Sequence, residues 1–139
     1  MRGIVVVSAA ALICLTGASG TAEAQPANKY APSAMVLTFA QGDSIEDTVL
    51  RAATLSCTPT PQGTHRDPKA ACAALNSTGG SFDRLLAAPQ ARRMCPMIYD
   101  PVTIAAVGVW QGSRVAWTHT FSNACVMSTA VSSSPVFAF

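Results

Sequence analysis

The chain has 139 residues, of which 50% are hydrophobic and 12% charged, and its formal net charge at pH 7 is +2. That length suits one domain, and so few basic residues argue against a nucleic-acid-binding surface. The apolar content excludes a disordered chain, and past the N-terminal segment no stretch is apolar enough to cross a bilayer, so neither nucleic acid nor a membrane is an expected partner.

The N-terminal segment has the organisation of an export signal. Arg2 precedes an apolar run, and a small-residue A-x-A motif ends at Ala24. We expect cleavage after Ala24, so that residues 1–24 are a signal peptide and residues 25–139 are a secreted, extracellular domain that starts with a flexible arm at 25–32. The alternative is an uncleaved membrane anchor.

Because the chain is expected to be exported, its cysteines are expected to form disulfides. Cys14 leaves with the signal peptide. The four that remain are Cys57, Cys72, Cys95 and Cys125. An even number in a small exported domain predicts two disulfides, and four cysteines allow three pairings among which spacing alone does not choose. No metal or other cofactor is expected, because there is no C-x-x-C and neither His65 nor His119 is spaced to complete a ligand pair.

Runs of β-branched and aromatic residues predict a sheet. The expected strands are 33–40, 51–57, 103–110, 114–121 and 135–139. The polar stretch 41–50 fits either a loop or a short helical turn. The third and fourth strands flank Gln111-Gly112-Ser113, a hairpin signal. By alternation, the buried face of this hairpin would carry Val107, Val109, Val115 and Trp117.

A helix is expected to begin at Asp67 and Pro68, because the Asp67 carboxylate can accept free amide hydrogens and Pro68 has none to lose. Alanine-rich sequence favours its continuation, and Gly79-Gly80 ends it. A second short helix is expected at 81–86. The predicted fold class is α+β: a five-stranded antiparallel sheet with two short helices packed on one face and two disulfides.

The connection before the third strand reads MCPMIYDP, from Met94 to Pro101. Its large apolar residues are Met94, Met97, Ile98 and Tyr99. A connection should be polar, so these side chains either plug into the core or form a surface for a partner, and composition leaves both open.

Backbone chemistry favours the partner surface. Pro96 fixes its own φ and pushes Cys95 toward an extended conformation, and a disulfide at Cys95 would tie the segment to the domain. A stiff, extended segment presenting Met97 is what a protease cleft binds, through main-chain hydrogen bonds and side-chain pockets.

A set of short motifs runs from Tyr30 to Phe139. They are YAPSAMVLT (Tyr30 to Thr38), SCTPTPQGTH (Ser56 to His65), CAAL (Cys72 to Leu75), MCPMIYDPV (Met94 to Val102), GVWQGSRV (Gly108 to Val115), FSNAC (Phe121 to Cys125) and VFAF (Val136 to Phe139). They occur in order over nearly the whole mature chain and include all four cysteines. In this ordered set the chain specifically resembles the Streptomyces-type subtilisin inhibitor family.

The resemblance implies sequential disulfides, Cys57–Cys72 and Cys95–Cys125, and a homodimer formed through the sheet. It implies a reactive bond at Met97–Ile98, with Met97 entering the specificity pocket of a protease. The other contact residues would be Met94, Cys95 and Pro96 before the bond and Tyr99 after it.

The expected function is therefore reversible, substrate-like inhibition of extracellular serine proteases of the subtilisin type, with chymotrypsin-like enzymes as a second class of target. The alternative is a secreted, disulfide-stapled binding or structural domain without a protease target. An enzyme is not expected, since the sequence has no G-x-S-x-G elbow, paired-carboxylate spacing or phosphate loop.

Overall fold

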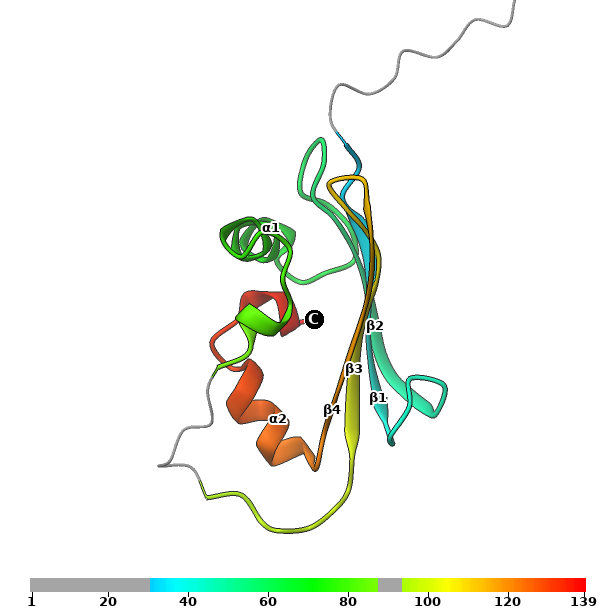
Figure 1. Ribbon diagram of the computed structural model, residues 1–139, viewed down its shortest axis with the longest axis vertical. Coiled ribbons are helices and arrows are strands. Elements are labelled where there is room, and N and C mark those ends of the chain that lie inside the picture. The colour runs from blue at the N-terminus through cyan, green and yellow to red at the C-terminus, as the bar shows by residue number, and fades with distance from the viewer. Residues whose placement is uncertain (1–30, 88–93) are drawn as a thin grey trace, which may run out of the picture.

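The computed structural model describes residues 31–87 and 94–139. The predicted signal peptide at 1–24 and most of the expected arm therefore lie outside the described residues. The described chain forms a four-stranded antiparallel sheet in the order β2-β1-β3-β4 (Figure 1). The strands are β1 (Ala34–Gln41), β2 (Thr48–Ser56), β3 (Val102–Trp110) and β4 (Ser113–Phe121). Each lies within a few residues of an expected strand.

The predicted fifth strand at 135–139 is wrong. Pro135–Phe137 instead form a short 3₁₀ turn, η2, with Pro135 in its first turn. Proline supplies no amide hydrogen for a strand ladder, and Val136 and Phe137 are buried against the rest of the core. Tertiary packing has overridden the strand propensity of these residues.

Two α-helices pack on one face of the sheet, and the other face is left uncovered (Figure 1). Helix α1 (Pro68–Ser77) begins where expected, with an Asp67 carboxylate oxygen accepting from the Ala70 amide at 3.0 Å. The predicted helix at 81–86 is only a 3₁₀ turn, η1 (Asp83–Leu85). The second α-helix is α2 (Ala124–Val131), which the sequence patterns did not indicate.

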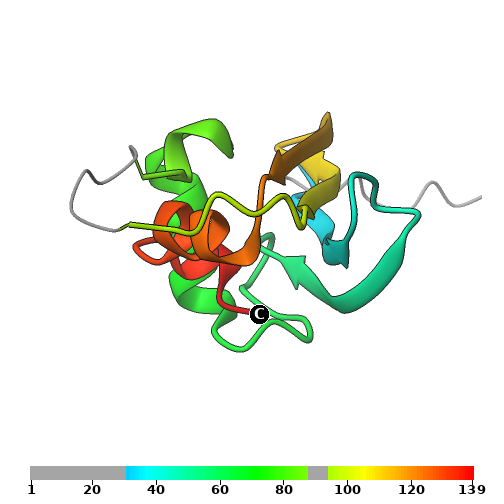
Figure 2. The same ribbon diagram turned by 90° about the horizontal axis from the view of Figure 1, so that it is seen from below.

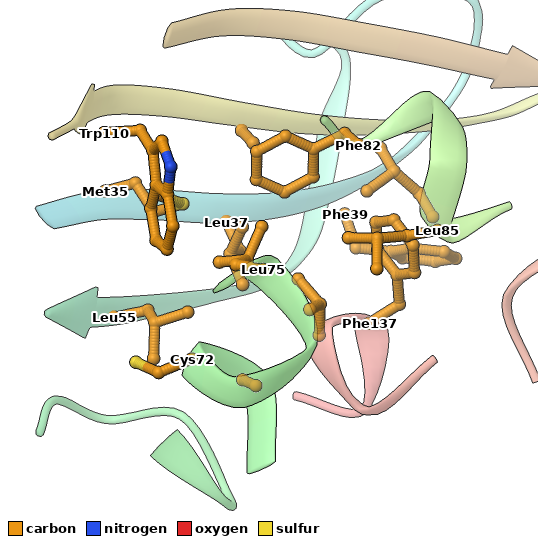
Figure 3. Packing of buried hydrophobic residues seen from close by; sticks show 14 of the residues in the cluster. Met35, Leu37, Phe39, Leu55, Cys72, Leu75, Phe82, Leu85, Trp110 and Phe137 are labelled. Carbon is orange, nitrogen blue, oxygen red and sulfur yellow. The ribbon is translucent and has the colours of Figure 1, made fainter. Parts of the chain in front are cut away.

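The core lies between the sheet and this layer of helices and turns (Figure 3). Leu37 of β1, Leu55 of β2 and Leu75 of α1 are almost completely buried in it. Alternate residues of each strand face this core. None of the helices in the described part of the chain is long and apolar enough to span a membrane.

The pairing of β3 with β4 shows that the expected buried face of the hairpin is wrong for the residues of β3. The turn places Gln111 and Gly112 at positive φ (47° and 81°) and pairs Trp110 with Ser113. Val107 and Val109 therefore lie opposite Ala116 and Arg114, on the uncovered face, and Val107 is 45% exposed.

The other half of that expectation holds, since Val115 and Trp117 of β4 are half-buried and pack against the core. Alternation within each arm of the hairpin was recognised, but its phase in β3 was wrong by one residue.

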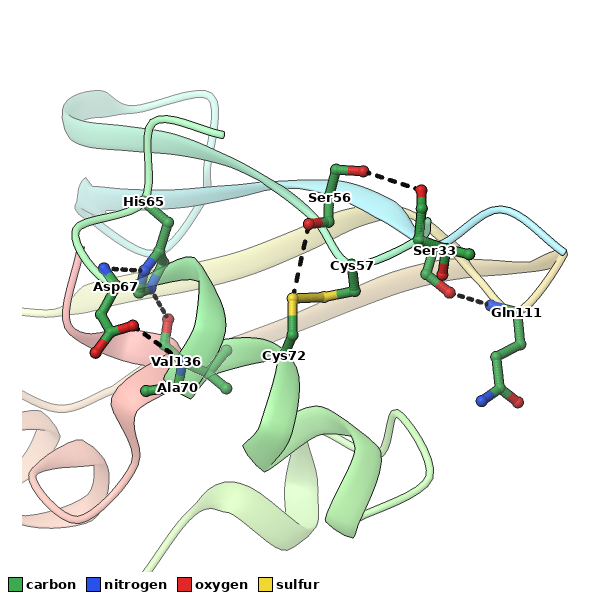
Figure 4. The surroundings of a disulfide bond; sticks show 10 residues. Ser33, Ser56, Cys57, His65, Asp67, Ala70, Cys72, Gln111 and Val136 are labelled. Carbon is green, nitrogen blue, oxygen red and sulfur yellow. Dashed lines mark hydrogen bonds between the residues drawn. A yellow bond between two sulfur atoms is a disulfide. The ribbon is translucent and has the colours of Figure 1, made fainter. Parts of the chain in front are cut away.

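The two disulfides are sequential, as the resemblance implies. Cys57–Cys72 joins the end of β2 to α1, with 5.5 Å between the Cα atoms (Figure 4). Cys95–Cys125 joins the segment before β3 to the start of α2, with 5.7 Å between the Cα atoms. The first fixes a helix on the sheet, and the second fixes the connection that carries the candidate site.

Candidate functional site

Residues 94–101, here called the ribbon, form neither helix nor strand. The ribbon passes along one end of the molecule, beside α2, before the chain enters β3 (Figures 1 and 2). Its apolar side chains point outward. Met94 and Met97 are essentially fully exposed, and Ile98 and Tyr99 are 64% and 69% exposed. Of the two interpretations left open by composition, the structure therefore favours a surface for a partner over a plug into the core.

Asn123 is the residue that braces the ribbon. It is only 7% exposed, and its Nδ2 donates to the carbonyl oxygens of Pro96 at 3.1 Å and Ile98 at 2.9 Å. Its Oδ1 accepts from the Val126 amide at 3.0 Å and so caps α2. The cap occupies the oxygen, which turns both amide hydrogens toward the ribbon. The two carbonyls that it holds lie on either side of Met97.

The disulfide adds a covalent attachment close to this brace. Cys125 lies in the first turn of α2, two residues after Asn123, and is bonded to Cys95 of the ribbon. The cap and the disulfide therefore use the same helix end. Because Val126 and Met127 of the same helix pack against the core, the backbone around Met97 is held against the rigid part of the domain.

A second set of contacts holds the end of the ribbon nearest β3. The Asp100 amide donates to the Ser122 carbonyl at 2.9 Å. The side-chain amide of Gln41 donates to an Asp100 carboxylate oxygen at 2.7 Å and to the Pro101 carbonyl at 3.0 Å.

Tyr99 adds a polar contact to this end of the ribbon. Its hydroxyl donates to the carboxylate of Asp43, and this hydrogen bond is the main cause that raises the pKa of Tyr99 above its ordinary value. The phenol therefore stays protonated, and able to donate, through the neutral pH range.

The two histidines lie in structural surroundings and form no metal or catalytic site with each other. His65 is buried, where its Nδ1 accepts from the Asp67 amide at 3.0 Å and its Nε2 faces the Val136 carbonyl at 3.0 Å (Figure 4). His119 is half-buried and packs between the rings of Trp117 and Phe121. Both have structural surroundings, and across residues 31–87 and 94–139 no cluster of three potential metal-binding side chains occurs.

The sequence indicated the ribbon and its disulfide but not the hydrogen bonds that support it. Asn123 appeared only within the FSNAC stretch, although an asparagine before a helix is a usual N-cap. Gln41 and Asp43 lay in a stretch regarded only as polar, and they carry no local signal that relates them to residues some sixty positions away.

Comparison with known proteins agrees with this architecture. Residues 31–123 match the family model described as "Subtilisin inhibitor-like". Subtilisin inhibitor-like protein 8 of Streptomyces virginiae is 62% identical over 109 residues, which cover 78% of this chain and 98% of that protein. Subtilisin inhibitor-like protein 15 of Streptomyces bikiniensis is 54% identical over 111 residues, covering 78% and 98% respectively.

Among solved structures, Streptomyces caespitosus sermetstatin in complex with Bacillus licheniformis subtilisin is similar, with a TM-score of 0.73 and 60% identity over 78% of this chain and 99% of that one. The fold and the site therefore define a class of protein: an α+β domain that presents an exposed ribbon held by hydrogen bonds and a disulfide. The chain belongs to the subtilisin inhibitor-like family, which confirms the resemblance seen in the sequence. This family consists of protease inhibitors and not of enzymes.

The hydrogen bonds that Asn123 makes predict the effect of replacing this residue. Asn123→Ala removes both hydrogen bonds to the ribbon and the helix cap, whereas Asn123→Asp keeps a cap acceptor and removes only the donors. Both changes should speed deuterium uptake at the Asp100 amide of the ribbon about tenfold or more. This amide donates to the Ser122 carbonyl, and the two part-buried hydrogen bonds that are lost hold the ribbon beside it.

Hydrogen-exchange mass spectrometry of a peptide spanning 94–101 checks this expectation. Asn76→Ala, at an exposed asparagine of α1, is the matched control and should leave uptake by the ribbon unchanged. Wild-type uptake in both Asn123 variants would show that the disulfide and the contacts near β3 hold the ribbon without Asn123.

Proposed function

We propose that this protein is a reversible, substrate-like inhibitor of serine endopeptidases of the subtilisin type, with Met97–Ile98 as the reactive bond. The observation that carries the proposal is the fully exposed Met97 on a ribbon whose flanking carbonyls are both held by the buried Asn123. Exposed apolar side chains and a fixed extended backbone are together what a protease cleft recognises.

In the proposed complex the ribbon docks as a substrate does. Met97 enters the primary specificity pocket, and Met94, Cys95 and Pro96 occupy the subsites before it. Tyr99 lies on the leaving side. The nucleophilic serine of the protease then meets the Met97 carbonyl carbon, whose oxygen lies at the oxyanion hole.

Slow turnover follows from the supports of the ribbon. The backbone is already held in place before docking, so little conformational entropy is lost and affinity is high. If the protease cuts the bond, the Cys95–Cys125 disulfide and Asn123 keep the two new ends near each other. Resynthesis of the bond then competes with release of the cleaved chain.

Specificity should depend on Met97. An unbranched, flexible apolar side chain suits the broad hydrophobic pocket of subtilisin-like enzymes and, less well, that of chymotrypsin-like enzymes. It has no charge to pair with an acidic pocket floor, so trypsin should be a poor target.

We also propose that the protein is exported, with residues 1–24 as its signal peptide and 25–139 as the mature chain. Two disulfides in so small a domain fit an oxidising, extracellular compartment, where a secreted protease would be met.

A homodimer formed through the uncovered face of the sheet is the proposed assembly. Val36 and Val107 are paired neighbours on that face and are 43% and 45% exposed. Thr54 and Ala116 extend the row on either side. The row is uncharged and apolar at its centre, so a second copy of the same face could cover it.

Met97→Lys tests the reactive bond. Lysine can pair with the acidic pocket floor of trypsin, so trypsin inhibition should strengthen about a hundredfold or more, while subtilisin inhibition weakens less than about tenfold. Inhibition constants measured by titration of peptide hydrolysis give the answer. Met94→Lys is the matched control and should gain no trypsin inhibition. If Met97→Lys gains none and Met97→Gly inhibits subtilisin as the wild type does, the contact lies elsewhere.

Replacing the ribbon disulfide tests the constraint. Cys95→Ser with Cys125→Ser should convert the inhibitor into a substrate that is cleaved at Met97–Ile98, because the two ends separate after the cut. The control, Cys57→Ser with Cys72→Ser, removes the disulfide remote from the ribbon and should lower the melting temperature but leave inhibition intact below it. Mass spectrometry of incubations with subtilisin follows cleavage. A stable, uncleaved Cys95/Cys125 variant would assign the constraint to Asn123 and packing.

Val107→Lys tests the dimer. Two lysines brought face to face at the centre of the row should give a monomer in sedimentation velocity at micromolar concentration, with subtilisin inhibition retained. Ala73→Lys on the exposed face of α1 is the control and should remain dimeric. A wild-type monomer, or a dimeric Val107→Lys variant, would contradict the proposed interface.

A further inference from the structure

The two sides of Met97–Ile98 are attached to the domain by different means. On the side before the bond, Cys95 is covalently linked to Cys125. On the side after it, Ile98, Tyr99 and Asp100 precede Pro101 and β3, and this short segment is held by hydrogen bonds alone. A cut would leave the covalent attachment intact on the first side, so hydrogen bonds would decide where the new amino terminus at Ile98 lies.

Most of the contacts on the leaving side come from the end of β1 and the turn after it. Gln41, the last residue of β1, donates to the Asp100 carboxylate and to the Pro101 carbonyl. The Gly42 amide donates to the same Pro101 carbonyl at 2.8 Å. One residue further on, Asp43 accepts from the Tyr99 hydroxyl.

The turn that presents these groups is itself fixed. Gly42 has φ +123°, and a Cβ there would lie 2.2 Å from a carboxylate oxygen of Asp47. Only glycine fits this position, and the Asp47 carboxylate accepts from the Ser44 amide at 3.0 Å. The Thr103 hydroxyl donates to the Gly42 carbonyl at 2.8 Å and ties the turn to β3. The groups that hold the leaving side are therefore in place before any protease binds.

We propose that Gln41 is a positioning residue for resynthesis of the Met97–Ile98 bond and that Asp43 assists it. This inference rests on the proposed function. In the acyl-enzyme, the Met97 carbonyl carbon is esterified to the protease serine, and Ile98 carries the free amine. Attack of that amine on the ester reforms the peptide bond and returns the proton to the serine oxygen, whereas attack of water releases Met97 as a carboxylate.

Gln41 influences this competition by keeping the Ile98 amine close to the ester. With Asp100 and Pro101 held, the freed segment has only Ile98 and Tyr99 in which to gain freedom. Asn123 still holds the Ile98 carbonyl, and Asp43 restrains Tyr99. Without the Gln41 bonds the cleaved form gains conformational entropy that the intact form does not. The ratio of cleaved to intact protein at equilibrium should rise accordingly.

The test is the equilibrium between intact and cleaved inhibitor with a catalytic amount of subtilisin, approached from both directions and resolved by reversed-phase chromatography and mass spectrometry. Gln41→Ala should raise the cleaved-to-intact ratio about fivefold or more, which corresponds to one or two hydrogen bonds. Gln41→Lys restores a donor toward the Asp100 carboxylate and the Pro101 carbonyl and should return the ratio most of the way to the wild-type value. Tyr99→Phe, which removes only the hydroxyl bond, should have a smaller effect in the same direction.

Gln62→Ala is the matched control. Gln62 is an exposed glutamine that pairs with Ser56 at the end of β2, whereas Gln41 pairs with Thr48 at its start. It should leave the ratio unchanged, and thermal unfolding should be close to wild type for every variant that is compared. A purely structural role of Gln41 would lower the melting temperature without moving the ratio or without rescue by lysine. Either result would overturn the inference about Gln41 and leave the proposed function intact.

A different result would overturn the proposed function together with this inference. If subtilisin neither is inhibited by the wild-type protein nor cuts it at Met97–Ile98, there is no bond for Gln41 to restore. If wild-type cleavage and inhibition occur as proposed and Gln41→Ala keeps the wild-type ratio, only the role of Gln41 is wrong.

Discussion

The side-chain amide of Asn123 is the constraint on which the rest of the site depends. Its oxygen caps α2 and its two hydrogens hold the carbonyls on either side of Met97. A buried amide whose oxygen and both hydrogens are bonded has one preferred orientation, since a flipped amide would leave these atoms unpaired. The start of a helix thereby sets the backbone conformation of a segment that has no regular structure of its own.

That constraint explains how a connection can display large apolar side chains and still be ordered. Leaving such a side chain in water forgoes about 1.5–3 kcal/mol relative to burying it. The ribbon exposes Met94, Met97, Ile98 and Tyr99. In isolation these groups would favour collapse onto the core, and the disulfide and hydrogen bonds prevent it. In the proposed complex with a protease these side chains would become buried, and their burial would contribute to affinity.

The sheet contributes by bringing distant segments to one end of the molecule. Antiparallel pairing of β1 with β3 sets Gln41 opposite Val102, so the end of β1 lies beside the point where the ribbon joins β3. Pairing of β3 with β4 returns the chain to the same end, where Ser122 and Asn123 follow β4. Three segments far apart in the sequence thus meet around the ribbon, and the disulfide closes the arrangement at α2.

The sequence by itself determined the features that are encoded within a few neighbouring residues. The start of α1 follows from Asp67 and Pro68, and the hairpin turn lies within the predicted stretch 111–113. The restriction that Pro96 places on its neighbours also marked the ribbon as a distinct segment. Caps, tight turns and proline restrictions depend on local backbone geometry, which is why they could be predicted.

Only the tertiary structure decided the features that depend on long-range packing. It turned Val136 and Phe137 into a buried 3₁₀ turn in place of a fifth strand, and it placed Val107 on the uncovered face through the register of the hairpin. It also brought Asn123 to the carbonyls of Pro96 and Ile98, more than twenty residues earlier in the chain. Such contacts form only when the whole core has closed, because strand pairing and helix packing, and no local pattern, set the distance between the partners.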